Sequence, residues 1–188
     1  INYTKDLFKN IDLELIIVDH NSEKIVVDKI KSIISNQFFK SKFIPLNIED
    51  FKNDIDPINE KKEKVIFNQM SNMCNIYQSL LLAKESKDLV YFVEDDYIHE
   101  EKCLFEMIET YERISSQLKR EIFICPSDYP YLYTDIDQSK IFAGSNRHWR
   151  SINKVLCTFL VSKEHLSKYW NNFNKTCLIR NDPFEKHI

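Results

Sequence analysis

Apolar residues in the first two thirds of the chain form short, nearly continuous runs. Residues 13–19 (LELIIVD) and 88–94 (DLVYFVE) are typical of strands buried on both faces of a parallel sheet. Residues 42–48 (KFIPLNI) predict a weaker strand, which Pro45 places near an edge or a bulge. Residues 121–126 (EIFICP) predict a fourth strand that ends at a proline.

Helical periodicity fills the intervals after these strands. Apolar residues recur every three or four positions in residues 67–86 and again in residues 100–118, so both stretches predict amphipathic helices. The alternation of strands and helices predicts an α/β fold with a Rossmann-like, mostly parallel central sheet and helices on both faces.

The pattern changes after residue 130. Weak strands are predicted at residues 139–143 and 155–162, followed by a short helix at about residues 163–173. We therefore expect one domain, residues 1–188, in which residues 131–188 form a mixed extension to the α/β part, residues 1–130.

Composition narrows the class of protein. The 188 residues are 43% hydrophobic and 29% charged, as in a soluble globular domain. The net charge of −3 is spread over both signs without a basic stripe, so no nucleic acid is expected as a partner. No apolar run approaches the roughly 20 residues of a transmembrane segment. Five cysteines without a CxxC pair favour reduced thiols in a cytoplasm.

The acidic triplet Glu94, Asp95 and Asp96 directly follows the second apolar run. Adjacent carboxylates repel one another and resist dehydration, so a bound cation would stabilise them. Oxygen ligands of this kind suit Mg²⁺ or Mn²⁺, which often share their coordination with substrate phosphates. Strand alternation places Glu94 and Asp96 on one side and Asp95 on the other. The alternative interpretation is a solvated strand end or a helix cap.

The order of "LELIIVDHNSEK" and "LVYFVEDDYIHE" resembles the GT-A glycosyltransferases, especially their family-2-like inverting members. In those enzymes the first motif contacts a nucleotide base and the acidic motif carries the ribose and a metal ion. The resemblance covers roughly residues 11 to 100 and implies a chain truncated at its N-terminus. It implies that Asp19 and Ser22 contact the donor base, that Glu94 and Asp95 contact the ribose or donor sugar, and that Asp96 binds Mn²⁺ or Mg²⁺.

The same resemblance implies a reaction. A hexosyl group would pass from a nucleotide-sugar donor to a hydroxyl of a glycan or another acceptor, with inversion, in surface polysaccharide or glycan synthesis. Residues 1–130 would bind the nucleotide and residues 131–188 the acceptor. The reaction needs a general base, and the candidates are Asp128 in "PSDYP" and Asp182 in "RNDPFEK". Each of these aspartates alternatively forms a turn beside a proline.

The stretch "GSNRHWRS" contains Gly144, the only glycine of the chain. Because glycine is so scarce, left-handed backbone positions are expected at Asn and Asp. Arg147 and Arg150 can pair with donor phosphates, His148 can bind a metal, and Trp149 can stack on an acceptor sugar. Alternatively, this is an exposed loop with Trp149 packed on the core and solvated arginines.

Two other functional classes fit parts of the sequence. One is a degenerate GT-A domain that binds a nucleotide or a glycan without turnover. The other is a phospho-receiver, in which "VEDD" would hold Mg²⁺ beside a phosphorylated aspartate, but the Thr and Lys strands that such a domain needs do not follow Asp128.

Overall fold

A computed structural model of the chain describes residues 11–127, 134, 138–153 and 158–181. It divides into two compact units. Of the described residues, the β3–β6 unit contains those between Ser86 and Tyr169, and the β1–β2 unit combines those up to Glu85 with those from Trp170 onward. This division does not coincide with the predicted one at residue 130.

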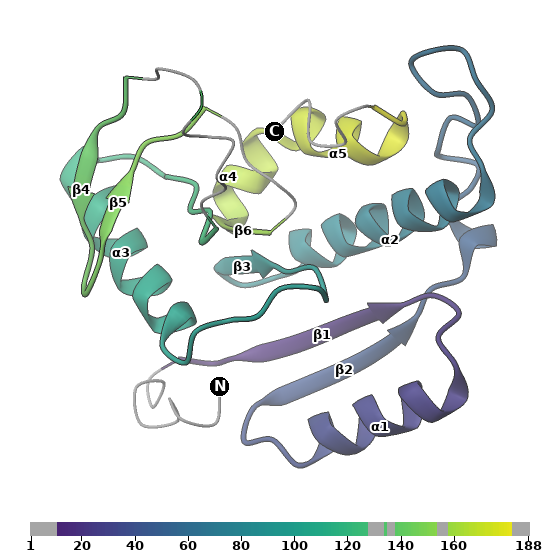
Figure 1. Cartoon of the computed structure of the whole chain (residues 1–188), viewed down its shortest axis with the longest axis horizontal. Helices are drawn as coiled ribbons and strands as arrows, with labels where there is room; N and C mark the ends of the chain where they lie inside the picture. The colour runs from purple at the N-terminus through teal and green to yellow at the C-terminus, as the bar shows by residue number, and fades with distance from the viewer. Residues whose placement is uncertain (1–10, 128–133, 135–137, 154–157, 182–188) are drawn as a thin grey trace. The chain divides into compact units, whose positions relative to one another are not determined.

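The β1–β2 unit is built on a parallel pair of strands (Figure 1). β1 (Glu14–Asp19) and β2 (Lys40–Pro45) pair in register from Glu14 opposite Lys40 to Asp19 opposite Pro45. Helix α1 (Lys24–Ser35) forms the connection between them. Hydrophobic periodicity did not predict α1, but a parallel strand pair requires a crossover of about a dozen residues, which is usually a helix.

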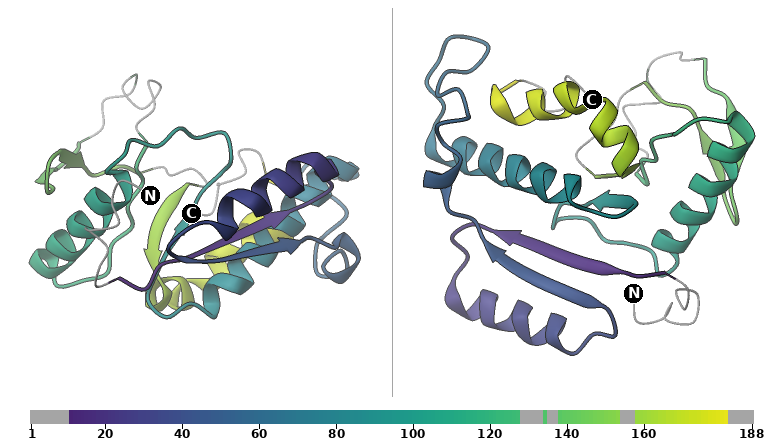
Figure 2. Two further views of the ribbon diagram at one scale, coloured as in Figure 1. Left: turned by 90° about the horizontal axis from the view of Figure 1, so that it is seen from below. Right: turned by 180° about the vertical axis from the view of Figure 1, so that it is seen from behind.

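Helices lie on both sides of this strand pair (Figure 2). Helix α2 (Phe67–Lys84) confirms the helix predicted from residue 67, and it packs against β1 and against helix α5 (Trp170–Leu178). The short 3-10 helix η2 (Ile48–Asp50) also contacts α2. One buried hydrophobic cluster of the unit consists of Leu46, Ile55, Val65, Met73 and Cys74.

The β3–β6 unit has an antiparallel pair at its centre. β3 (Leu89–Phe92) pairs with β6 (Phe159–Ser162), so the predicted extension contributes a strand beside the acidic motif. Residues 121–126 form no strand but a single bridge, in which the Ile124 and Leu160 backbones exchange hydrogen bonds of 3.0 and 2.7 Å. Pairing with β6 thus replaces the predicted parallel neighbour of β3.

Two helices and a hairpin complete this unit. Helix α3 (Cys103–Leu118) confirms the second predicted helix, and α4 (Lys163–Lys168) follows β6. The hairpin pairs β4 (Ile141–Ala143), which lies within the strand predicted at residues 139–143, with β5 (His148–Arg150), which lies where a loop was expected. One buried hydrophobic cluster of the unit consists of Met107, Tyr111, Ile124 and Leu160.

The predicted mixed α/β class is therefore confirmed, because the structure contains both helices and strands. Over the part of the chain that the structure describes, however, the sheets are two-stranded, one parallel and two antiparallel, and they do not form a clear parallel central sheet. No helix within these same residues is long and apolar enough to cross a bilayer.

The left-handed backbone positions differ from the expectation. Asn21, Lys62 and Lys119 have positive φ values of 65°, 67° and 53°. Two of these three residues are lysines rather than Asn or Asp, whose side chains tolerate this region more readily. Gly144 is not at a positive φ, so its role is different.

Candidate functional site

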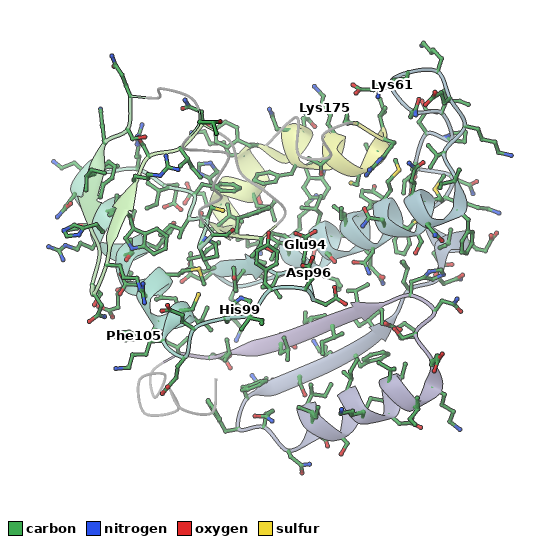
Figure 3. The ribbon with its side chains drawn as sticks, in the orientation of Figure 1. Lys61, Glu94, Asp96, His99, Phe105 and Lys175 are labelled. Carbon is green, nitrogen blue, oxygen red and sulfur yellow. The ribbon has the colours of Figure 1, made fainter. Side chains whose placement is uncertain are left out.

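The acidic triplet lies exposed at the carboxyl end of β3, where Figure 3 labels Glu94 and Asp96. The Glu94 backbone N–H donates a hydrogen bond of 3.2 Å to the hydroxyl of Thr158. Thr158 is fully buried and immediately precedes β6, so this bond fixes the point at which the chain leaves the sheet. The exposed carboxylates therefore project from an anchored backbone.

Tyr97 joins this acidic strand end, and sequence reasoning missed it. Burial raises the pKa of its phenol above the ordinary value, and the nearby charges of Glu94 and Asp96 add to the increase. A hydrogen bond with the Ser127 side chain acts in the opposite direction. β3 ends at Phe92, and Asp95 and Asp96 lie in a turn, so the predicted strand alternation does not extend to the triplet. A Tyr directly after an acidic strand end was the available signal.

The segment after Ile124 reaches the same place. The Cys125 thiol donates to the backbone oxygens of Ser127 at 3.5 Å and Thr158 at 3.6 Å. Ser127 in turn bonds with Tyr97. The ends of β3 and of residues 121–125 thus meet beside the start of β6. Asp128 follows Ser127 in sequence, but both predicted bases, Asp128 and Asp182, lie outside the described residues.

The described residues at this strand end do not by themselves complete a site for a divalent cation. Within the described segments, no three His, Cys, Asp or Glu side chains are gathered so that they could hold a metal ion. Among the described residues, Asp96 and His148 are therefore not joined with further ligands into a three-ligand metal site. Mg²⁺ in particular is usually bound through one or two carboxylates together with water and substrate phosphates, and Asp96 can supply one such carboxylate.

The glycine-containing stretch is organised by a buried glutamate. Glu106 of α3 is only 5% exposed, and its carboxylate accepts hydrogen bonds from the backbone N–H groups of Ser145 at 3.1 Å and Asn146 at 2.7 Å. It also accepts from the Trp149 indole at 3.1 Å and from the Thr110 hydroxyl at 3.2 Å. These bonds compensate the burial of a charged group and hold the hairpin turn on α3.

A glycine is required at position 144 because side-chain atoms of neighbouring residues lie close to its Cα atom. A Cβ atom at this position would lie 2.5 Å from Trp149 Nε1 and 2.6 Å from both Glu106 Oε1 and Thr110 Oγ1. The Gly144 carbonyl accepts a hydrogen bond of 2.9 Å from Arg113. The only glycine of the chain therefore allows the backbone to pack directly on the polar cluster of α3.

The remaining predicted residues of this stretch lie along the hairpin. Trp149 is partly buried, packs against the core of the β3–β6 unit and donates to Glu106, which matches the structural interpretation of this residue. Strand alternation places His148 and Arg150 on the other face of β5, where His148 is exposed. Arg147 forms an exposed ion pair with Glu100. Such a pair contributes about 1 kcal/mol or less, so Arg147 can exchange it for a phosphate at little cost.

Asp19 and Ser22 lie at the end of β1, in the other unit. The Asp19 carboxylate accepts hydrogen bonds from the Ser22 backbone N–H at 3.4 Å and from the Ser22 hydroxyl. Asn21 supplies the left-handed residue of this turn. The Asp19 side chain therefore closes the turn after β1, and its contact with a base stays a prediction.

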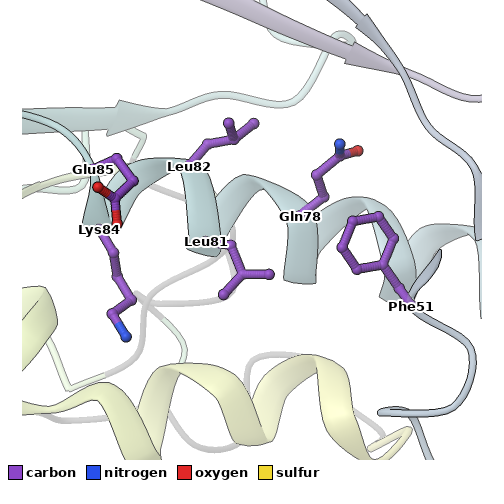
Figure 4. A pocket seen from close by; sticks show the side chains of 6 residues that line it. All are labelled: Phe51, Gln78, Leu81, Leu82, Lys84 and Glu85. Atoms are coloured by element: carbon purple, nitrogen blue, oxygen red, sulfur yellow. The ribbon is translucent and has the colours of Figure 1, made fainter.

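The β1–β2 unit also has an open hollow of about 370 Å³ beside α2 (Figure 4). Phe51, Leu81 and Leu82 give it a mostly apolar lining, to which Lys84 and Glu85 add charges. The Gln78 side-chain oxygen is buried and accepts no hydrogen bond from the described residues. The Lys84 ammonium lies 4.2 Å from the ring centroid of Trp170. No predicted site residue lines this hollow.

Comparison of the chain with protein-family models, curated proteins and solved structures gives no match.

Proposed function

We propose that the chain is a metal-dependent glycosyltransferase with a GT-A-like arrangement, which transfers a sugar from a nucleotide-sugar to a hydroxyl acceptor. The observation that carries the proposal is the acidic end of β3, where the exposed carboxylates of Glu94, Asp95 and Asp96 follow a backbone that the Glu94–Thr158 hydrogen bond holds to the start of β6. Ligands of α/β proteins commonly bind outside the carboxyl ends of strands. The resemblance of the two sequence motifs supports the same assignment.

Asp96 is the proposed holder of the cation, with Glu94 beside it and Asp95 directed toward the ribose or sugar. When bound, a divalent cation supplies Lewis-acid stabilisation of the charge that develops on the departing diphosphate. Tyr97 orients the acidic strand end through its bond with Ser127. Arg147 offers a further positive charge for the diphosphate after release from Glu100.

A general base must accept the proton of the acceptor hydroxyl. Of the two predicted bases, Asp128 is favoured by its position in the sequence, because Ser127 directly before it bonds with Tyr97. Asp182 remains the alternative.

The first test is calorimetric titration of UDP and GDP, with and without Mn²⁺, into the wild type and the Asp96→Asn variant. We expect metal-dependent binding of one nucleotide and a loss of about tenfold or more in the variant, since a charged oxygen ligand is replaced by a neutral one. Thermal unfolding should be unchanged, because Asp96 is exposed.

Glu101→Gln is the matched control, since it removes a charge from an exposed residue of the same loop. Equal weakening in both variants would indicate a nonspecific charge effect. Metal-independent binding that survives Asp96→Asn would favour the non-catalytic binding domain, which the absence of a three-ligand metal group among the described residues also allows.

A further inference from the structure

The β4–β5 hairpin is positively charged in a chain that is negative overall. Residues 140–150 contain no acidic residue, whereas the whole chain has a net charge of −3. The basic residues of this stretch are Lys140, Arg147, His148 and Arg150. A local excess of one sign of charge attracts ligands of the opposite sign. The hairpin is therefore a candidate surface for an anionic partner.

Strand pairing gathers part of this charge on one face of the hairpin. Ile141 lies opposite Arg150, and Ala143 lies opposite His148. Because successive side chains of a strand alternate, these four side chains share the face that points away from Trp149. We call these four residues the outer hairpin face. Ile141 is 65% exposed, so the outer hairpin face combines cationic groups with an aliphatic contact.

The outer hairpin face is held in place, because the opposite face is fixed to α3 (Figure 1). The Trp149 indole and the Asn146 backbone N–H both donate hydrogen bonds to the buried carboxylate of Glu106. The Arg113 side chain donates to the Gly144 carbonyl at 2.9 Å. A surface that is ordered before binding loses little conformational entropy when a ligand binds.

The hairpin turn adjoins the acidic loop after β3. Arg147 of the turn forms an ion pair with Glu100, which follows Asp96 by four residues. The charge therefore changes sign across this contact, from the acidic loop to the basic hairpin. A ligand that spans the contact meets positive charge on one side and the acidic triplet on the other.

The position of the hairpin separates the possible anionic partners. A continuous polyanion such as a nucleic acid is repelled by the acidic loop. A membrane surface needs a larger apolar contact than Ile141, which is the one exposed large apolar residue in the described residues 140–150. A glycan in which acidic and neutral sugars alternate can place a carboxylate on the hairpin and a neutral sugar at the acidic loop.

We infer that the outer hairpin face binds the carboxylates of an acidic glycan, which is the acceptor of the proposed transfer. The choice of a glycan among anionic partners rests on the proposed function, whereas the negative charge of the partner follows from the hairpin itself. The Arg150 guanidinium can bind a carboxylate through two parallel N–H donors. Ile141 offers an apolar contact to the C–H groups of a sugar ring.

The test is calorimetric titration of two oligosaccharides into the full chain. One is a hyaluronan hexasaccharide, in which a uronic acid and N-acetylglucosamine alternate, and the other is a neutral chitin hexasaccharide. The acidic probe should bind about tenfold or more tightly at low salt, and the preference should shrink as the ionic strength rises. Arg150→Gln should weaken binding of the acidic probe by about threefold and Arg150→Glu by about tenfold.

Arg120→Glu is the matched control, since Arg120 is an exposed arginine of the same unit outside the hairpin. Equal weakening by both charge reversals, or equal affinity for the two oligosaccharides, overturns the inference. Tighter binding of a single-stranded oligonucleotide than of the acidic probe overturns it as well. An equal loss of UDP or GDP binding in Arg150→Glu does the same, because Arg150 then serves the donor phosphates.

The inference and the proposed function fail separately. Acidic-glycan binding without metal-dependent nucleotide binding would leave an anionic-glycan-binding domain and refute the glycosyltransferase. Metal-dependent nucleotide binding through Asp96 without a preference for the acidic glycan would leave the proposed function and refute the inference.

Discussion

At the scale of single residues, Glu106 is a charged residue buried within the β3–β6 unit. Burial of its carboxyl acts to raise its pKa, but hydrogen bonds from Trp149, Asn146 and Thr110 outweigh burial and hold the pKa below its ordinary value. A carboxylate that is hydrogen-bonded in this way favours the folded state as long as it is ionised.

Stability should therefore depend on the ionisation of Glu106. Its contribution is complete near neutral pH and is lost as the pH falls below the range of an ordinary glutamate toward the lowered pKa. Glu106→Gln keeps the shape but turns an amide N–H₂ toward donors, and should cost about 2 to 4 kcal/mol at neutral pH. Urea unfolding from about pH 7 to about pH 3.5 measures both effects.

The free energy of unfolding of Glu106→Gln should also decrease less than that of the wild type as the pH falls into the acid range. Glu109→Gln is the control, since Glu109 is an exposed residue of the same helix. A Glu106→Gln variant as stable as Glu109→Gln at neutral pH would show that the buried carboxylate does not hold the hairpin.

At the scale of elements, the C-terminus of α3 depends on a left-handed residue. Lys119 caps the helix with φ 53° and ψ 41°, and the Arg120 N–H bonds to the Ser115 oxygen at 3.2 Å. Glycine is the usual residue at such a helix end because it has no Cβ penalty there.

Lys119→Gly should consequently stabilise the chain by about 0.5 to 1 kcal/mol. Lys119→Ala removes the same side chain without the conformational freedom of glycine, and should be close to neutral or slightly destabilising. Chemical denaturation of the three proteins compares them directly. A glycine variant less stable than the alanine variant would contradict the assignment of this helix cap.

At the scale of the whole molecule, the question is whether the chain turns over a donor or only binds it. A glycosyltransferase should hydrolyse its nucleotide-sugar slowly without an acceptor, because water can replace the acceptor hydroxyl. We expect release of UDP or GDP from the matching nucleotide-sugar with Mn²⁺, and a loss of at least about tenfold after chelation or in Asp96→Asn.

Asp128→Asn should lower hydrolysis while leaving nucleotide binding intact, since a general base acts on the attacking hydroxyl and not on the diphosphate. Coupled detection of the released nucleotide measures the rate. Donor binding without any metal-dependent release, in the presence of candidate acceptors, would identify a binding domain instead.

Local pattern alone determined the elements whose signal lies within a few neighbouring residues. Strands β1 and β3 and helices α2 and α3 were predicted from apolar runs and helical periodicity, and the acidic triplet was correctly placed at a strand end. These features depend on which side chains can be buried along one segment, and that information is present in the segment itself.

Only the tertiary structure decided which segments meet. The pairing of β6 with β3, the bond of Tyr97 with Ser127 and the burial of Glu106 under the hairpin join residues far apart in the sequence. Gly144 was expected to open a loop, but the structure shows that a larger residue would clash there with Trp149 and with Glu106 and Thr110 of α3. Such contacts depend on the packing of one element against another, which no single segment encodes.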